Sequence, residues 1–177
     1  MQLQRLLRDV TSADVADTQD IEILDITYDS RQVSPGALFV AVPSVGAGPE
    51  SGGTTHIHEA VARGAVAVVT ESDTEVDGIS TIRVPDARTA LADLAAEYFG
   101  HPSKQLNVFA VTGTDGKTTT SYLLEAIASE AGYTTGMIGT IETKIGERRE
   151  PNPERMTTPE SLDVQRLLRT MVDTGVT

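Results

Sequence analysis

The stretch N-V-F-A-V-T-G-T-D-G-K-T-T-T, residues 107–120, decides the fold of the second part of this chain. Its apolar run, Val108–Val111, predicts a buried strand; two glycines then predict a tight loop, and Lys117 opens a segment of helical spacing. Proteins cradle polyphosphates with a strand that breaks into such a loop and continues as a helix. The loop N–H groups point at the anion, and the helix N-terminus adds a partial positive charge.

The residue types of this loop fit nucleotide chemistry. Lys117 would reach the outer phosphates of a nucleotide, and the hydroxyl of Thr118 would ligate Mg²⁺. The loop is compact, because the common pattern G-x-x-x-x-G-K-[ST] needs a glycine where Val111 stands. An ordinary strand-to-helix turn, in which Gly and Asp occur for backbone reasons alone, is the alternative. The Lys-Thr pair at the mouth of the helix favours the phosphate loop.

Composition and charge limit the class of protein. The 177 residues can form one or two domains with buried cores, and the absence of cysteine excludes disulfides and thiolate metal sites. No apolar run approaches the roughly 20 residues of a membrane span. The N-terminus lacks the apolar core of a signal peptide, so we expect a cytoplasmic protein without a membrane partner. The net charge of −12 argues against nonspecific nucleic-acid binding.

Periodicity and turn residues predict an α/β order of elements in two domains, with the boundary at the linker His101-Pro102-Ser103. Residues 1–103 carry a net charge of −10 and residues 104–177 one of −2, so an anionic ligand is better tolerated in the second domain. In the first domain we expect helices over 2–10, 56–63 and 87–98, the last capped by Asp86, and strands over 21–26, 37–42, 65–70 and 79–84. In the second domain we expect a helix from Lys117 to Gly132, a strand over 134–140 and a hairpin turning at Gly146. A last helix should start at Thr158, with Pro159 in its first position, and end at Gly175.

Three other groups could carry chemistry. Asp29-Ser30-Arg31 brings a carboxylate, a hydroxyl and a guanidinium together between two strands, a pattern that by itself is typical of a polar turn. Thr157-Thr158 stands at a predicted helix start, where threonine serves as a cap but can also present its hydroxyl and N–H groups to a phosphate. His56 and His58 are two residues apart and have no third ligand, so we interpret them as structural or exposed.

In order and spacing, seven segments together resemble the Mur ligases, and most closely the MurE type. They are D-S-R-Q-V-S-P-G-A-L-F-V-A-V (29–42), A-V-A-R-G-A-V-A-V-V (60–69), V-P-D-A-R-T-A-L-A (84–92), Y-F-G-H-P-S (98–103), V-T-G-T-D-G-K-T-T-T (111–120), G-Y-T-T-G-M-I-G-T (132–140) and T-T-P-E-S-L-D-V-Q-R-L-L (157–168). The fifth segment is similar to the ATP loop of the family, which accounts for its compact form.

The resemblance implies a fold, an activity and a set of site residues. The fold would be a small N-terminal α/β domain that binds a UDP-linked substrate, residues 1–103, followed by the first part of a P-loop central domain, residues 104–177. The enzyme would use ATP and Mg²⁺ to add the third amino acid to UDP-N-acetylmuramoyl-dipeptide in peptidoglycan synthesis, through an acyl phosphate. ATP would be bound by Gly113, Thr114, Asp115, Gly116, Lys117, Thr118 and Thr119, with Lys117 as the catalytic lysine on the β- and γ-phosphates and Thr118 on Mg²⁺. Tyr28, through its backbone, and Ser30 would hold the UDP group, and Thr157 and Thr158 would contact the muramoyl-peptide.

The chain departs from the family pattern in four places. Asp115 and Met156 stand where asparagine is common, and residues 43–55 form a longer loop without the usual Asp-Gly-His, so no contact is carried over from that loop. The chain also stops before the acidic Mg²⁺ ligand, the carbamylated lysine and the C-terminal domain of the family. We therefore expect these 177 residues to be inactive alone, and to self-associate or be disordered near 141–177.

Three other functions stay open at this point. The chain could belong to another Mur-fold ligase, such as a folylpolyglutamate or cyanophycin synthetase relative. It could be a P-loop kinase or simple NTPase, which would leave residues 1–103 without an evident role. It could also be a non-catalytic UDP-sugar-binding module. The segment D-S-R…P-G-A-L-F favours the Mur branch.

Overall fold

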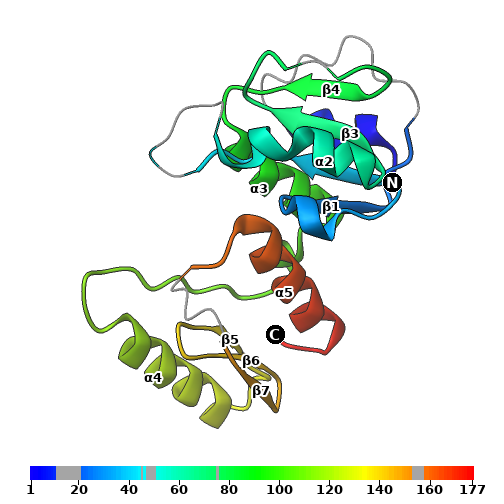
Figure 1. Ribbon diagram of the computed structural model, residues 1–177. Coiled ribbons are helices and arrows are strands. Elements are labelled where there is room, and N and C mark those ends of the chain that lie inside the picture. Colours follow the sequence, from blue (N-terminus) through cyan, green and yellow to red (C-terminus); the bar gives the residue numbers. More distant parts are fainter. Residues whose placement is uncertain (11–20, 45, 47–50, 75, 153–157) are drawn as a thin grey trace. The chain divides into compact units, whose positions relative to one another are not determined.

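The chain forms two compact units, Met1–Tyr98 and Phe99–Thr177, in the computed structural model (Figure 1). The structure describes residues 1–10, 21–44, 46, 51–74, 76–152 and 158–177. The units divide a few residues before the linker at which the sequence predicts the boundary. The assignment of residues 1–103 to a UDP substrate and of residues 104–177 to ATP stays a prediction.

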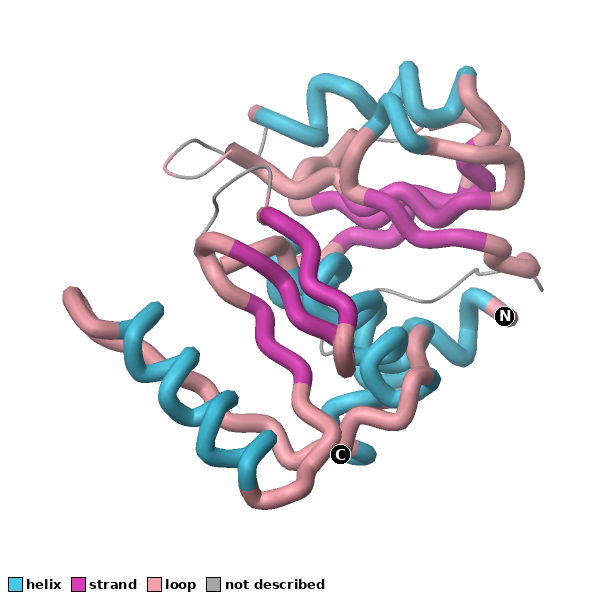
Figure 2. Tube along the Cα trace, turned by 90° about the horizontal axis from the view of Figure 1, so that it is seen from below, coloured by secondary structure: helices cyan, strands magenta, loops and turns pink. Residues whose placement is uncertain are grey.

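The first unit is built on a four-stranded parallel sheet in the order β1-β2-β3-β4. Its strands are drawn in magenta in Figure 2. Its strands are β1 Asp25–Thr27, β2 Ala37–Val40, β3 Ala65–Thr70 and β4 Ser80–Arg83. All four residues of β2 are buried, and β3 is apolar over five of its six residues. Continuous apolar runs of this kind are what a parallel sheet covered on both faces requires.

Three helices cover the sheet of the first unit. They are α1 Leu3–Leu6, α2 Ile57–Ala62 and α3 Ala87–Tyr98. On one face, Ile57 and Ala60 of α2 pack with Phe39 and Val68 of the sheet. α1 packs against α3 and buries Leu3 and Leu6.

The predicted cap of α3 is confirmed. Asp86 Oδ1 accepts hydrogen bonds from the N–H groups of Arg88 and Thr89, both at 2.9 Å. A side-chain oxygen before the first turn thus satisfies two donors that a helix leaves without partners.

The second unit has two helices and an antiparallel sheet. The helices are α4 Lys117–Glu130 and α5 Ser161–Asp173, and the sheet has the order β5 Gly136–Ile138, β6 Glu142–Ile145 and β7 Arg148–Pro151. α4 contacts β5 of this sheet. The predicted hairpin is confirmed: β6 and β7 pair and reverse at Gly146, whose φ of 58° suits glycine. No helix in the described ranges of either unit is long and apolar enough to cross a membrane.

Several predicted elements differ in the structure. The helix expected over 2–10 is α1 followed by a 3₁₀ turn, Leu7–Asp9, and the strand expected over 134–140 is limited to β5. The expected strand Val108–Val111 is wrong: no described residue pairs with it, and Phe109 is 81 % exposed. An apolar run becomes a strand of a sheet only where a neighbouring strand supplies hydrogen-bond partners, and among the described residues β5 pairs with β6 alone.

Two further differences are shifts of an element boundary. The strand expected over 21–26 shortens to β1, because Ile23 exchanges backbone hydrogen bonds of 2.7 Å with Met1. The last helix begins at Ser161 and not at Thr158. The backbone is still extended at Glu160, its N-cap residue, with ψ 153°, so Pro159 lies outside the first turn.

Candidate functional site

The phosphate-loop residues predicted from sequence lie together at the N-terminus of α4. Gly113 and Gly116 have φ values of 148° and 76°, and α4 begins at Lys117, directly after the second glycine. A Cβ added at Gly116 would meet no atom within 4 Å. Glycine is therefore favoured at 116 by the left-handed backbone conformation and not by lack of space.

The side chain of Lys117 folds back over the loop. Its Nζ donates hydrogen bonds to the carbonyl oxygens of Gly113 at 2.6 Å and Thr114 at 3.3 Å. Both partners are neutral, and among the described residues no carboxylate forms an ion pair with this ammonium group. The charge of Lys117 thus remains available to an anion.

Backbone donors converge on the same place. Within the described chain, no acceptor faces the N–H groups of Lys117, Thr118 and Thr119, and the next N–H, that of Thr120, bonds to Gly116 O at 2.9 Å. These free N–H groups carry the partial positive charge of a helix of 14 residues.

This donor set fits a polyphosphate. An ammonium group and several N–H groups meet at one helix start, where anions bind. For Mg²⁺ the hydroxyl of the half-buried Thr118 offers a ligand, and the described residues contain no cluster of three acidic or histidine side chains to hold a metal by themselves. Asp115 is exposed in the same loop.

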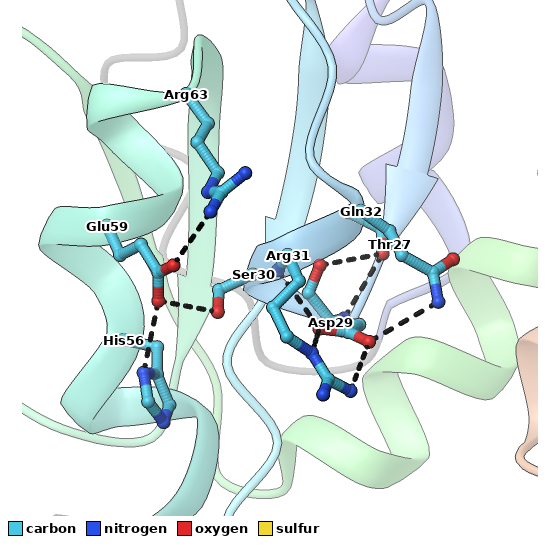
Figure 3. A network of polar contacts seen from close by, with 8 residues as sticks. All are labelled: Thr27, Asp29, Ser30, Arg31, Gln32, His56, Glu59 and Arg63. Carbon is cyan, nitrogen blue, oxygen red and sulfur yellow. Dashed lines mark hydrogen bonds and ion pairs between the residues drawn. The ribbon is translucent and has the colours of Figure 1, made fainter.

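A second candidate site follows β1 in the first unit. Asp29 begins a short 3₁₀ turn, Ser30–Gln32, and its carboxylate accepts both the N–H of Arg31 at 3.0 Å and two guanidinium N–H groups of Arg31 at 2.9 and 2.8 Å (Figure 3). The hydrogen bonds from Arg31 lower the pKa of Asp29 to about 2. Behind this turn, Thr27 Oγ1 accepts the N–H of Asp29 at 3.1 Å. The polar-turn interpretation accounts for Asp29 and Arg31.

Ser30 points away from that pair, towards α2 (Figure 3). Its Oγ donates to Glu59 Oε2 at 3.0 Å, and the residue is only 6 % exposed. Glu59 also pairs with Arg63 at 3.2 Å and with His56 at 3.3 Å. Ser30 is therefore a link between the turn and a helix nearly thirty residues further along the chain.

The remaining predicted site residues differ in how far they are exposed. Tyr28 is half-buried beside Ser30, and Thr158 is exposed ahead of α5. Thr157 lies outside the described residues. His56 and His58 are both exposed, as the sequence predicts, although His56 also flanks Glu59.

Sequence analysis missed two groups of charged residues. Glu59 gave no signal beyond its spacing of four residues from Arg63. In the second unit, Glu125 of α4 and Lys144 of β6 form an ion pair whose side chains are each 8 % exposed, and Thr135 donates to the same carboxylate at 2.9 Å. No local sequence pattern reports such contacts between distant segments.

Both parts of the chain are similar in sequence to known proteins. Residues 22–99 match the model "Mur ligase family, catalytic domain" and residues 111–177 match "Mur ligase middle domain". A UDP-N-acetylmuramyl-tripeptide synthetase of Roseiflexus sp. (strain RS-1) is 48 % identical over 157 residues, which are 87 % of this chain and 30 % of that protein. A UDP-N-acetylmuramoyl-L-alanyl-D-glutamate–2,6-diaminopimelate ligase of Geobacillus thermodenitrificans (strain NG80-2) is 43 % identical over 176 residues, 99 % of this chain and 35 % of that protein.

Solved structures agree with the sequence relatives. The structure of a UDP-N-acetylmuramoyl-L-alanyl-D-glutamate–2,6-diaminopimelate ligase superposes on this chain with a TM-score of 0.77 and 27 % identity. The superposition covers the whole of this chain and 34 % of the ligase. MurF from Acinetobacter baumannii shares the fold over 96 % of this chain and 32 % of its own, with a TM-score of 0.59 and 24 % identity. The chain thus spans about a third of the length of its curated relatives. The predicted α/β class is confirmed, and the chain belongs to the Mur ligase family.

Proposed function

We propose that this chain supplies the UDP-substrate-binding and ATP-binding segments of a MurE-type ligase. Such an enzyme adds the third amino acid to UDP-N-acetylmuramoyl-dipeptide in the cytoplasmic synthesis of peptidoglycan precursors. The names of two relatives support this choice, because one is called a tripeptide synthetase and the other a diaminopimelate ligase. The observation that carries the proposal is the loop at the head of α4, where the ammonium of Lys117 and free N–H groups converge.

Each part of the loop has a role in this function. Gly113, Thr114, Asp115 and Gly116 would let the backbone approach the phosphates of ATP, and Thr119 would add an N–H group from the first turn of α4. Lys117 would neutralise the β- and γ-phosphates, and the hydroxyl of Thr118 would ligate Mg²⁺. ATP supplies the phosphoryl group that activates a carboxylate. Fixed positive groups favour this chemistry because they stabilise the charge that develops during transfer.

The substrate side is assigned to the other predicted residues. Ser30 and the backbone at Tyr28 would hold the UDP group, and Thr157 and Thr158 would contact the muramoyl-peptide. The position of Ser30 after a parallel strand supports this role, since ligands of α/β sheets bind beyond the carboxyl ends of the strands.

Nucleotide binding by the chain itself tests the ATP assignment. We expect Mg·ATP to bind the wild-type chain in calorimetry and to bind Lys117→Ala roughly tenfold or more weakly, because hydrogen bonds to charged groups contribute about 1.5–3 kcal/mol. The matched control is Lys104→Ala, which removes an exposed lysine of the same unit and should bind as the wild type does. Equal loss in both variants, or no binding by the wild type, would remove the ATP assignment.

A further inference from the structure

The partner of Ser30 decides which kind of hydrogen bond this residue can offer. Ser30 Oγ lies 3.0 Å from Glu59 Oε2. The pKa of Glu59 is lowered, first by the hydrogen bond from Ser30 and further by Arg63 and His56, so the carboxyl is ionised at neutral pH. An ionised carboxylate only accepts hydrogen bonds. The proton of the Ser30 hydroxyl must therefore point at Glu59.

A hydroxyl has one proton and two lone pairs. With its proton committed to Glu59, Ser30 Oγ can only accept from any other group. A ligand atom that reaches it has to bring an N–H or an O–H. Phosphate oxygens and carbonyl oxygens are acceptors, so neither can form a hydrogen bond with this hydroxyl.

The surroundings keep this arrangement in place. Glu59 is held on its other oxygen by Arg63 Nη2 at 3.2 Å, and His56 Nδ1 approaches the oxygen that Ser30 uses at 3.3 Å. Arg31, a further charged group that interacts with Glu59, is bound to Asp29 in a bidentate pair. Ser30 itself is nearly buried and is the first residue of the 3₁₀ turn, which side-chain hydrogen bonds of Asp29 and Thr27 hold in place. The hydroxyl is thus oriented before a ligand arrives, which lowers the entropy cost of binding.

We propose that Glu59 is a positioning residue which turns Ser30 into a hydrogen-bond acceptor for a donor group of the uridine half of the substrate. This inference rests on the proposed binding of a UDP-linked substrate at Ser30. It adds the direction of the hydrogen bond: the substrate donates and Ser30 accepts. The donors of the uridine half are the imide N–H of the base and the ribose hydroxyls. The diphosphate has no donor in its ionised form, so it must be bound by other groups.

Binding of nucleoside diphosphates to the chain tests the direction of this hydrogen bond. UDP is compared with CDP, whose ring nitrogen at the same position is an acceptor, and with 2′-deoxy-UDP and 3′-deoxy-UDP, which each lack one hydroxyl. For the wild type, we expect one of the three analogues to lack the donor group that Ser30 accepts. UDP should bind at least roughly fivefold more tightly than that analogue, because the analogue loses about one hydrogen bond. The analogue that loses affinity identifies the donor as the base or the ribose.

Variants then distinguish whether Glu59 orients the Ser30 hydroxyl or only stabilises the fold. Ser30→Ala should bind UDP and that analogue equally. Glu59→Gln should also lose the preference, because its amide can donate to Ser30 and release the hydroxyl proton. Arg63→Gln, which removes a contact of Glu59 but none of Ser30, should keep the preference. A change in stability alone would weaken all ligands together and leave these ratios unaltered.

The outcomes distinguish this inference from the function on which it rests. If the wild type binds no UDP, the assignment of UDP to this site and the inference both fail. If UDP binds and the ratios stay the same in Ser30→Ala and Glu59→Gln, the inference about the direction of the hydrogen bond is overturned while the UDP site stands. Ser30→Ala alone decides the matter if Glu59→Gln does not fold.

Discussion

The carboxylate of Asp29 accepts hydrogen bonds from the turn that it begins, from Arg31 and from the amide of Gln32. The bonds from Arg31 are the main reason that the pKa of Asp29 falls from 3.8 to about 2. A carboxyl whose pKa is lower in the folded state stabilises the fold in its ionised form. This stabilisation is complete above the unfolded-state pKa of 3.8 and is lost as the pH falls towards about 2.

We predict that Asp29→Asn lowers the free energy of unfolding of the first unit by about 1 kcal/mol at pH 7, the worth of a partly exposed hydrogen-bonded group. The same variant should lose less stability than the wild type as the pH falls from 3.8 to about 2. Urea unfolding followed through the amide signals of β2 measures both effects. Asp73→Asn is the control, because Asp73 pairs with Arg83 but is 79 % exposed, and surface pairs contribute little. An unchanged pH dependence in Asp29→Asn would contradict the prediction.

Contacts at the residue scale could be predicted from the sequence only where they are local. Asp29 and Arg31 are two residues apart, and their turn follows from the order Asp-Ser-Arg between two strands. The hydrogen bond from Ser30 to Glu59 joins a turn to a helix 29 residues away. Its existence depends on how α2 packs on the sheet, which the local pattern does not report.

At the scale of elements, α4 is held by charge as well as by packing. None of its residues is fully buried, and its apolar side chains Leu123 and Ile127 are 59 % and 66 % exposed. The carboxylate of Glu125 is nevertheless covered, with Lys144 of β6 and Arg149 of β7 as its cationic partners and Thr135 as a neutral donor. The hydrogen bond from Lys144 lowers the pKa of Glu125 further than the other contacts do. This network ties the helix that carries the phosphate loop to the hairpin.

We predict a strong coupling between the two members of the buried pair. Lys144→Met should destabilise the second unit by about 3 kcal/mol, because the Glu125 carboxylate then stays buried with only Arg149 as a cation. In Lys144→Met combined with Glu125→Leu, much of that loss should be recovered, since no charge is left unpaired. A double-mutant cycle from denaturant unfolding gives the coupling energy. Additive losses would show that the pair contributes nothing as a pair.

Elements with local signals could be predicted best. The hairpin follows from Gly146 between two polar strands, and α4 follows from its helical spacing and from the stop at Gly132. The prediction of a strand at Val108–Val111 is wrong because a strand needs a neighbouring strand to pair with, and an apolar run does not indicate which segment that neighbour is. The start of α5 was misplaced because Pro159 suits an extended segment as well as a first helical turn.

The molecule as a whole exposes apolar side chains in an uneven way. On α4, Leu123, Leu124 and Ile127 lie within one turn of each other and are 42–66 % exposed, and Phe109 before the phosphate loop is 81 % exposed. Singly exposed apolar residues are normal, but neighbouring ones on one helix form a patch that favours association.

We predict that the chain self-associates and that substitutions in this patch reduce it. Leu123→Lys combined with Ile127→Lys should shift the sedimentation profile towards monomer at concentrations where the wild type associates. Leu24→Lys is the control, because Leu24 is similarly exposed, at 61 %, but lies in the first unit. Association that is unaffected by the α4 variant, or equally reduced by Leu24→Lys, would place the contact elsewhere.

We finally predict that these 177 residues bind nucleotide without turning it over. Phosphoryl transfer depends on positioning and on a metal held firmly between phosphates. The chain spans about a third of the length of its curated relatives, and its phosphate loop contributes the Thr118 hydroxyl as a candidate metal ligand. The purified chain, incubated with Mg·ATP, UDP-N-acetylmuramoyl-dipeptide and amino acids, should release no substrate-dependent phosphate and form no tripeptide. Lys117→Ala, assayed in parallel, reports any contaminating ligase. Product that forms with the wild type and disappears with Lys117→Ala would prove the prediction wrong, because the chain would then hold everything that the reaction requires.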